Sequence, residues 1–301
     1  MALDEKLVKD ESGSMFSSVF GLLRALVALS KPGVTTLNVF ATAVALVLAP
    51  AAITTQTIVL ILIGTTLIVA SAGAANMIYE RESDAKMERT AKRPLPAGLI
   101  SIQSAYLYSG FGLVVGLFML YQVSILPAMF GLIGWLVYVA IYTPMKSKTP
   151  LSLYTGAMAG AVTPFIGYSA VTSLDGMAWW LGAVLFLWQL PHVLAIAIFR
   201  EVDYQRAGIR FYSGLKARIL LIGWLLVFAV VPWFLPFFAN TKIVYLISIP
   251  FLSAMIGWSL PALFRNYKQV EESAKTARSI FFQTLLHLPV IFSVVIVDQL
   301  V

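Results

Sequence analysis

The sequence predicts an all-α polytopic membrane protein with nine transmembrane helices in a single bundle. Hydrophobic residues make up 59% of the 301 residues and charged residues only 12%, with a mean hydropathy of +0.87, whereas a soluble domain is about 25% charged. The apolar stretches are continuous and long enough to cross a bilayer as helices, and they lack the alternation of a membrane β-barrel. The chain has no cysteine, which excludes disulfides and thiolate metal sites.

Nine apolar stretches have the length of a transmembrane helix. In chain order they cover residues 33–50, 57–79, 103–122, 125–143, 153–173, 177–199, 217–238, 243–264 and 279–300. Charged segments end the second, fourth, sixth and eighth stretches. Pro94 and Pro96 stop any helix after the second span and turn the chain toward the third. Gly156, Gly160 and Gly167 in the fifth span indicate close helix packing.

The basic residues predict the orientation of these helices. All but one of the 21 lysines and arginines precede the first span or follow an even-numbered span, and the exception is Lys242. Because basic loops stay in the cytoplasm, we expect residues 1–30 to be a cytoplasmic N-terminal segment. Residues 31–301 would form a nine-helix transmembrane domain with its C-terminus outside. The net charge of +7 is therefore a topology signal, and we expect no nucleic acid as a partner.

The first residues of the chain bear on its location. They include four acids, Asp4, Glu5, Asp10 and Glu11, which argue against an Arg-rich, acid-poor mitochondrial presequence. The simplest location for such a multi-pass protein is a bacterial plasma (inner) membrane, with the lipid bilayer as its permanent partner.

The most informative polar segment begins while the second apolar stretch is still running. Asn76, Glu80 and Asp84 are spaced i, i+4, i+8 and therefore share one face of a helix. Oxygen ligands at a membrane-helix end are costly unless a cation binds them, and such hard ligands suit Mg²⁺ together with substrate phosphates. We interpret the three residues as catalytic magnesium ligands. A loop that only enforces topology is the alternative, but acids contribute little to that task.

Basic residues follow this motif and would suit the phosphate itself. They are Arg89, Lys92 and Arg93. A smaller basic patch, Lys146 and Lys148, follows the fourth span. It could close over a phosphate, and a plain positive-inside anchor explains it equally well.

A second polar segment follows the sixth span and would face the first motif across the bundle. Asp203 is its main acid, with Glu201 as a helper, and we predict Asp203 to be a further catalytic magnesium ligand. Arg200 would contact the phosphate. In the alternative interpretation, the two acids only neutralise Arg200 and Arg206.

His192 lies inside the sixth apolar stretch, directly after Pro191. An ionisable group at membrane depth is a functional-site hypothesis, and an imidazole can ligate iron or transfer a proton. A packing role with a hydrogen bond to a neighbouring helix is the alternative. We interpret His287, in the last span, as structural.

The pattern Asn76-x-x-x-Glu80-x-x-x-Asp84, followed by Lys-Met-Glu-Arg89-Thr, resembles the first aspartate-rich motif of the intramembrane aromatic prenyltransferase superfamily. The details are most similar to its branch of protohaem farnesyltransferases, or haem O synthases. The segments Leu-Trp-Gln-Leu-Pro191-His192 and Asp203-Tyr204-x-x-Ala-Gly208-Ile also resemble that branch. The resemblance covers about residues 28–210. It departs at Glu80, where the family normally has Asp, and at Arg210-Phe-Tyr-Ser-Gly, where the family has a proline-rich turn.

The resemblance implies transfer of a farnesyl group from farnesyl diphosphate to a vinyl group of haem B, giving haem O for terminal oxidases. It implies Mg²⁺ as cofactor, bound by Asn76, Glu80, Asp84 and Asp203. Haem A synthase or oxidase assembly factors would be protein partners. The substrate-binding residues expected are Arg89, Lys92, Arg93, Lys146, Lys148, His192, Arg200 and Tyr204.

Two other functions remain open on the sequence. A prenyltransferase could act on a quinone precursor or another aromatic ring, although a phenolic acceptor gives no reason for Pro191-His192. A transporter could use buried acids for ion coupling, but it predicts acids at mid-membrane and internal repeats. Here the acids gather at the cytoplasmic helix ends.

Overall fold

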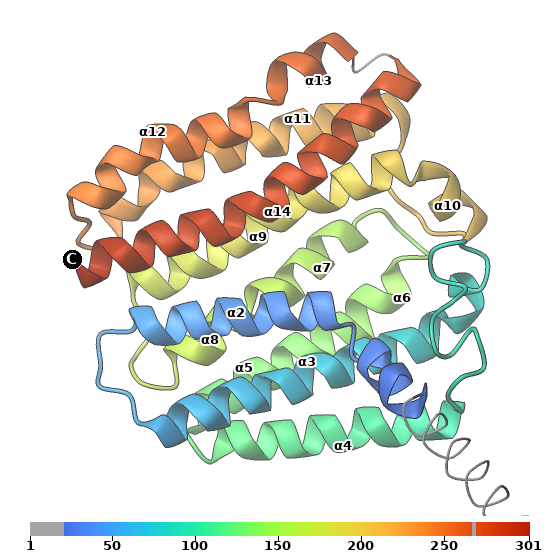
Figure 1. The fold of residues 1–301 in the computed structure, drawn as a ribbon, viewed down its shortest axis with the longest axis horizontal. Helices are drawn as coiled ribbons and strands as arrows, with labels where there is room; N and C mark the ends of the chain where they lie inside the picture. Colours follow the sequence, from blue (N-terminus) through green and yellow to red (C-terminus); the bar gives the residue numbers. More distant parts are fainter. Residues whose placement is uncertain (1–20, 267–268) are drawn as a thin grey trace, which may run out of the picture.

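The computed structural model describes residues 21–266 and 269–301, and within these ranges it contains helices and turns but no strand. Most of the helices run alongside one another as a bundle (Figure 1). The all-helical architecture predicted from the sequence is therefore confirmed. Residues 1–20 of the expected N-terminal segment and Lys268 of the eighth loop lie outside the described residues.

The first half of the chain forms the helices on one side of the bundle. A helix over Gly21–Leu29 precedes them and is bent by 55° relative to the next. The helices on this side of the bundle are α2 (Pro32–Leu48), α3 (Thr55–Asp84), α4 (Ile102–Tyr121), α5 (Ile125–Leu136), the π-helix η1 (Val137–Tyr142), α6 (Thr143–Met145), α7 (Ser152–Ala161) and α8 (Thr163–Tyr168).

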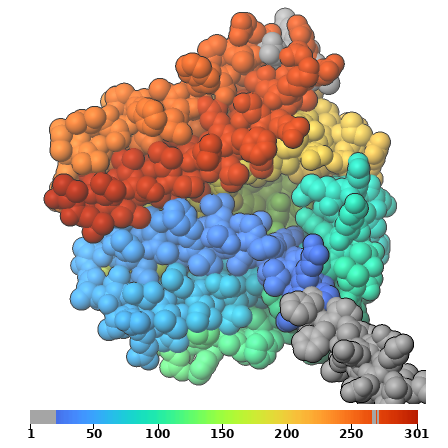
Figure 2. Space-filling view, viewed as in Figure 1, coloured from blue at the N-terminus to red at the C-terminus, as the bar shows by residue number. Residues whose placement is uncertain are grey.

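The second half forms the other side of the bundle (Figure 1). Its helices are α9 (Gly176–Phe199), α10 (Glu201–Arg206), α11 (Gly214–Val230), the 3₁₀-helix η2 (Val231–Phe237), α12 (Ile243–Gly257), α13 (Leu260–Asn266) and α14 (Val270–Leu300). Figure 2 shows α14 in red beside α2 in blue on one face. The rings of Phe40 and Phe292, one from each helix, lie 6.1 Å apart.

In the described part of the chain, seven helices are long and apolar enough to cross a membrane. The helix over Gly21–Leu29 and α2 together form an eighth candidate if this bent pair is counted as one span. The predicted fifth span, 153–173, is divided into α7 and α8 instead of forming one helix. Pro164 explains the break, because it has no N–H to continue the ladder. The Thr163 hydroxyl compensates by donating to the Gly160 carbonyl at 2.9 Å. The Thr42 hydroxyl of α2 donates to the Thr163 carbonyl at 3.0 Å and so links α2 to the break.

The glycines of this broken span pack as the sequence predicts. A Cβ atom on Gly167 would lie 2.1 Å from the Thr42 carbonyl oxygen, so α8 contacts α2 backbone to backbone. A Cβ on Gly160 would lie 2.5 Å from the Gln189 side chain, and one on Gly156 would lie 2.8 Å from the Tyr142 ring. A larger side chain at Gly167 would therefore require α2 to move, whereas at Gly160 and Gly156 the side chains of Gln189 and Tyr142 would have to move.

Candidate active site

Helix α3 carries the first polar motif at one end of the bundle. The helix continues to Asp84 and so contains all three predicted ligands. Asn76, Glu80 and Asp84 are only 1%, 8% and 1% exposed, whereas Glu82 between them faces solvent. The i, i+4, i+8 spacing therefore places the three side chains on a single buried face of the helix.

Each of these three side chains contacts a basic residue from a different part of the chain. The ammonium of Lys31 donates to Oδ1 of Asn76. Lys146 Nζ lies 2.7 Å from a Glu80 oxygen. The site is thus a set of buried oxygen atoms facing a set of positive charges, as binding of both a metal and a diphosphate requires.

The third basic partner is Arg93, whose Nη1 lies 2.7 Å from Oδ2 of Asp84. The segment between Asp84 and Arg93 is held against the end of α3, because the buried hydroxyl of Thr90 donates to the Asp84 carbonyl at 2.8 Å. The other carboxylate oxygen of Asp84, Oδ1, is buried and has no hydrogen-bond partner. A buried carboxylate oxygen without a partner is costly, and a bound cation would satisfy it.

The residue types therefore fit Mg²⁺, which binds hard oxygen ligands. In the described ranges, no group of three His, Cys, Asp or Glu residues is close enough to hold a metal ion. The protein would contribute Asn76, Glu80 and Asp84, of which only two are acids. The substrate phosphates would supply further oxygen ligands.

The π-helix η1 and the residues after it position Lys146. Such single-turn π segments occur frequently at functional sites. The Thr143 hydroxyl accepts a hydrogen bond from Asn76 Nδ2 at 2.9 Å and donates to the Tyr138 carbonyl at 2.8 Å. Burial disfavours the charged ammonium of Lys146, but Tyr142 and the Glu80 carboxylate outweigh burial and hold the pKa of Lys146 above that of a free lysine.

The second polar segment adjoins this site from the other half of the chain. The Arg210 backbone N–H donates to the Lys146 carbonyl at 2.7 Å. Lys146, Tyr204 and Arg210 line one small cavity. Asp203 is half-buried and lies 3.7 Å from Arg200, and both line a separate hollow with Glu201. The structure thus brings Tyr204 to the Lys146 side of the site, whereas the adjacent Asp203 lines the separate hollow.

Four of the predicted phosphate contacts lie on the surface. They are Arg89, Lys92, Lys148 and Arg200. Arg93 and Lys146 are the members of the predicted set that the structure pairs with the α3 carboxylates.

His192 of α9 packs against α14. Its ring stacks on Trp188 at 4.6 Å between centroids and lies 4.8 Å from Phe281. Its Nδ1 is 2.9 Å from the Thr284 hydroxyl. Gln189, on the same helix, lines the apolar cavity described next, and His192 is not among its lining residues.

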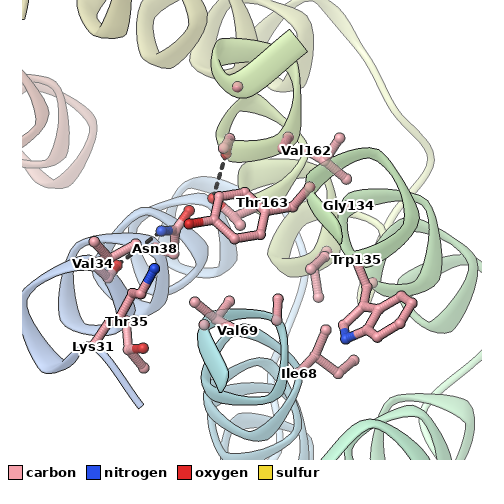
Figure 3. Close-up of a pocket in the computed structure, with 18 of the residues that line it drawn as sticks. Lys31, Val34, Thr35, Asn38, Ile68, Val69, Gly134, Trp135, Val162 and Thr163 are labelled. Atoms are coloured by element: carbon pink, nitrogen blue, oxygen red, sulfur yellow. Dashed lines mark hydrogen bonds between the residues drawn. The ribbon is translucent and has the colours of Figure 1, made fainter. Parts of the chain in front are cut away.

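An apolar cavity of about 100 Å³ begins beside the polar cluster and extends into the bundle. Figure 3 shows Lys31, directly before α2, and Thr35 and Asn38 of α2 on one wall, and Trp135 and Val162 on the other. Ile68 and Val69 of α3 close the space between these walls. The site therefore joins a charged mouth to an apolar interior.

Sequence reasoning does not mark Lys31, Tyr138 and Thr143 as site residues. Lys31 adopts a left-handed conformation, with φ of 51°, at the bend before Pro32. This strained backbone places its ammonium against Asn76 and in the lining of the cavity. The signal in the sequence was the segment Ser30-Lys31-Pro32 at the start of a span, which resembles the family but does not by itself mark the lysine as a site residue.

Comparisons with known proteins agree with this geometry. A family model described as the UbiA prenyltransferase family matches residues 38–286. A protein from Anaeromyxobacter dehalogenans named protoheme IX farnesyltransferase is 34% identical over 279 residues, covering 90% of this chain and 92% of its own. One of the same name from Sorangium cellulosum is 35% identical, covering 82% and 89%.

Solved structures with the same fold are more distant in sequence. One from work on digeranylgeranylglyceryl phosphate synthase in membranes superposes with a TM-score of 0.74 at 16% identity, covering 92% of this chain and 98% of that chain. A UbiA homologue from Archaeoglobus fulgidus, bound to GPP and Mg²⁺, gives a TM-score of 0.68 at 16% identity, covering 90% and 99%.

Proposed function

This chain belongs to the UbiA prenyltransferase family, and from this premise we propose that it transfers a farnesyl group from farnesyl diphosphate to a vinyl group of haem B. In the overall reaction, farnesyl diphosphate, haem B and water give haem O and diphosphate. The name shared by the relatives that are 34–35% identical over most of the chain supports this choice of substrates. Family membership removes the ion-coupled transporter from the alternatives.

The observation that carries the proposal is the position of the α3 motif at the mouth of an apolar cavity. Asn76, Glu80 and Asp84 offer buried oxygen ligands. Lys31 contacts Asn76 and also lines the cavity. A substrate with an anionic head and a long apolar tail matches both parts of this site.

The reaction breaks the bond between farnesyl C1 and the diphosphate oxygen, and the electron pair leaves with the diphosphate. Mg²⁺ held by Asn76, Glu80 and Asp84 would neutralise that leaving group. Lys146 and Arg93 hold ammonium and guanidinium groups at the α3 carboxylates, where they can donate charge-assisted hydrogen bonds to the departing oxygens. The apolar cavity keeps the allylic carbon away from bulk water until the outer vinyl carbon bonds to it. The inner vinyl carbon, left electron-deficient, then takes a hydroxyl group from water, and a proton is released.

Extraction of haems from a bacterial host that makes haem B but no haem O tests the acceptor. Expression of this chain should produce haem O, and expression of Asp84→Asn should not. If haem remains unchanged while prenylated quinone precursors accumulate, the acceptor is an aromatic ring of another class.

We further propose nine spans, with α7 and α8 together forming the fifth, in a bacterial inner membrane with the N-terminus in the cytoplasm. The distribution of basic residues supports this orientation. Because the chain has no cysteine, single cysteines can be introduced cleanly. A cysteine at Lys92 should react with a membrane-impermeant maleimide only from the cytoplasmic side, and one at Lys242 only from outside. Labelling of both positions from the same side would refute the model.

We also propose that His192 contributes to haem use. It lies on α9 seven residues before Phe199, where the helix ends, or about 10 Å along the helix, a depth suited to an apolar substrate and not to the diphosphate. His192→Ala should raise the KM for haem and leave the affinity for farnesyl diphosphate unchanged. Normal haem kinetics with a lowered Tm would assign His192 only to its packing against Trp188 and Phe281.

A further inference from the structure

The apolar cavity has a deep end as well as a charged mouth. Lys31 lies at the mouth, beside Asn76. Along α3 the lining residues run from Gly73 down to Ile68, which is eight residues from Asn76. At 1.5 Å per residue, Ile68 lies about 12 Å below Asn76. Ile166 of α8 lines the same cavity and, like Ile68, is almost fully buried.

A packed apolar cluster closes this deep end. Ile68 and Ile166 belong to it, together with Ile61, Leu120 and Ala128, and all of these side chains are buried. The cavity therefore ends on close-packed residues of α3, α4, α5 and α8.

The Ile68 side chain has little freedom to move aside. A Cβ atom built on Gly116 would lie 2.7 Å from Ile68 Cγ1, and one built on Gly131 would lie 2.8 Å from Ile68 Cδ1. Two backbones, from α4 and α5, therefore pack directly against the isoleucine. Backbone in regular helices yields less than a flexible side chain, so this part of the floor is stiff.

Hydrogen bonds fix the same three helices one turn nearer the mouth. The Ser71 hydroxyl donates to the Ser109 carbonyl at 2.7 Å, and the Ser109 hydroxyl donates to the Ser71 carbonyl at 3.0 Å. Trp135 Nε1 donates to the Ser71 hydroxyl at 3.0 Å. These bonds tie α3 to α4 and α5, so the wall behind Ile68 cannot open without breaking them.

We infer that Ile68, backed by Gly116 and Gly131 and joined by Ile166, sets the length of the prenyl chain that this protein accepts. The inference rests on the proposed function. At about 1.25 Å of advance per carbon–carbon bond, the twelve-carbon main chain of a farnesyl group extends on the order of 14 Å. This matches the depth from Asn76 to Ile68, whereas a geranylgeranyl group needs roughly 5 Å more and would meet the floor.

The test measures equilibrium affinity and not turnover. Full-length protein in detergent is titrated with the non-reactive thiolo-diphosphate analogues of geranyl, farnesyl and geranylgeranyl diphosphate, in the presence of Mg²⁺. Ile68→Ala should shift the affinity ratio toward the geranylgeranyl analogue by about tenfold or more, the scale at which apolar pockets discriminate by size. Val69→Phe fills the cavity one residue nearer the mouth and should shift the ratio toward the geranyl analogue.

The matched control is Ile63→Ala, the same truncation on the same helix at a side chain that is 46% exposed. Its ratio should equal that of the wild type. Unchanged ratios in both Ile68→Ala and Val69→Phe would overturn the inference, and the paired variants keep it testable if one fails to fold. Because no acceptor is present, the result is independent of haem: a wild type that prefers the farnesyl analogue but does not prenylate haem would defeat the proposed function alone.

Discussion

Asp84→Asn should reduce farnesyl transfer by at least about 100-fold while the protein remains folded. The substitution removes the charge from a carboxylate that has one oxygen paired with Arg93 and the other buried without a partner. Loss of one group that stabilises a developing negative charge typically lowers kcat by about 10²–10³-fold. The fold should persist because the Asp84 carbonyl keeps its hydrogen bond from Thr90.

Glu82→Gln is the matched control for this prediction. Glu82 lies two residues away on the same helix, its side chain is 81% exposed, and it pairs only with the neighbouring Arg81. Its turnover should stay within about twofold of the wild type, since exposed pairs contribute little. Both variants are assayed by product formation at saturating Mg²⁺. Near wild-type turnover of Asp84→Asn would remove Asp84 from the site.

Lys146→Met should lower kcat/KM for farnesyl diphosphate by about 100-fold, because the ammonium beside Glu80 supplies charge to the departing diphosphate. It should also lower the Tm, since Glu80 is buried and would lose its partner. The double variant Lys146→Met/Glu80→Gln separates these effects. It should recover much of the Tm and none of the activity.

The control for charge alone is Lys86→Met, because Lys86 is exposed at the same end of the bundle. Its kcat/KM and Tm should match the wild type. If Lys146→Met loses stability but the double variant regains full activity, Lys146 serves only to neutralise Glu80.

The sequence was sufficient to predict most helices because the length of an apolar stretch directly reflects bilayer thickness. Helices α4 and α9 begin within a residue of the expected positions. The division of the fifth span was not predictable in the same way. It depends on Pro164 and on the Thr163 hydroxyl, which donates to the Gly160 carbonyl that Pro164 leaves without its N–H donor. It also depends on contact with α2, where Thr42, 121 residues away, donates to the Thr163 carbonyl.

The candidate site was likewise predictable only where local helix geometry determines it. Local helical spacing was enough to place Asn76, Glu80 and Asp84 on one face. The basic residues that contact these three side chains could not be identified from the local sequence, because every lysine and arginine at this end of the bundle carries the same charge. Lys31 reaches Asn76 across 45 residues of chain, and only the packing of α2 against α3 creates that contact.

Mass analysis of the porphyrin tests the central claim most directly. The purified full-length protein is incubated with farnesyl diphosphate, haem B and Mg²⁺, and the extracted haem is compared with that from Asp84→Asn. The wild type should convert haem B to a product heavier by one farnesyl group and one hydroxyl, with release of diphosphate, and the variant should not. Unmodified haem B from an active, folded wild type, alongside farnesyl transfer to a phenolic acceptor, would contradict the account.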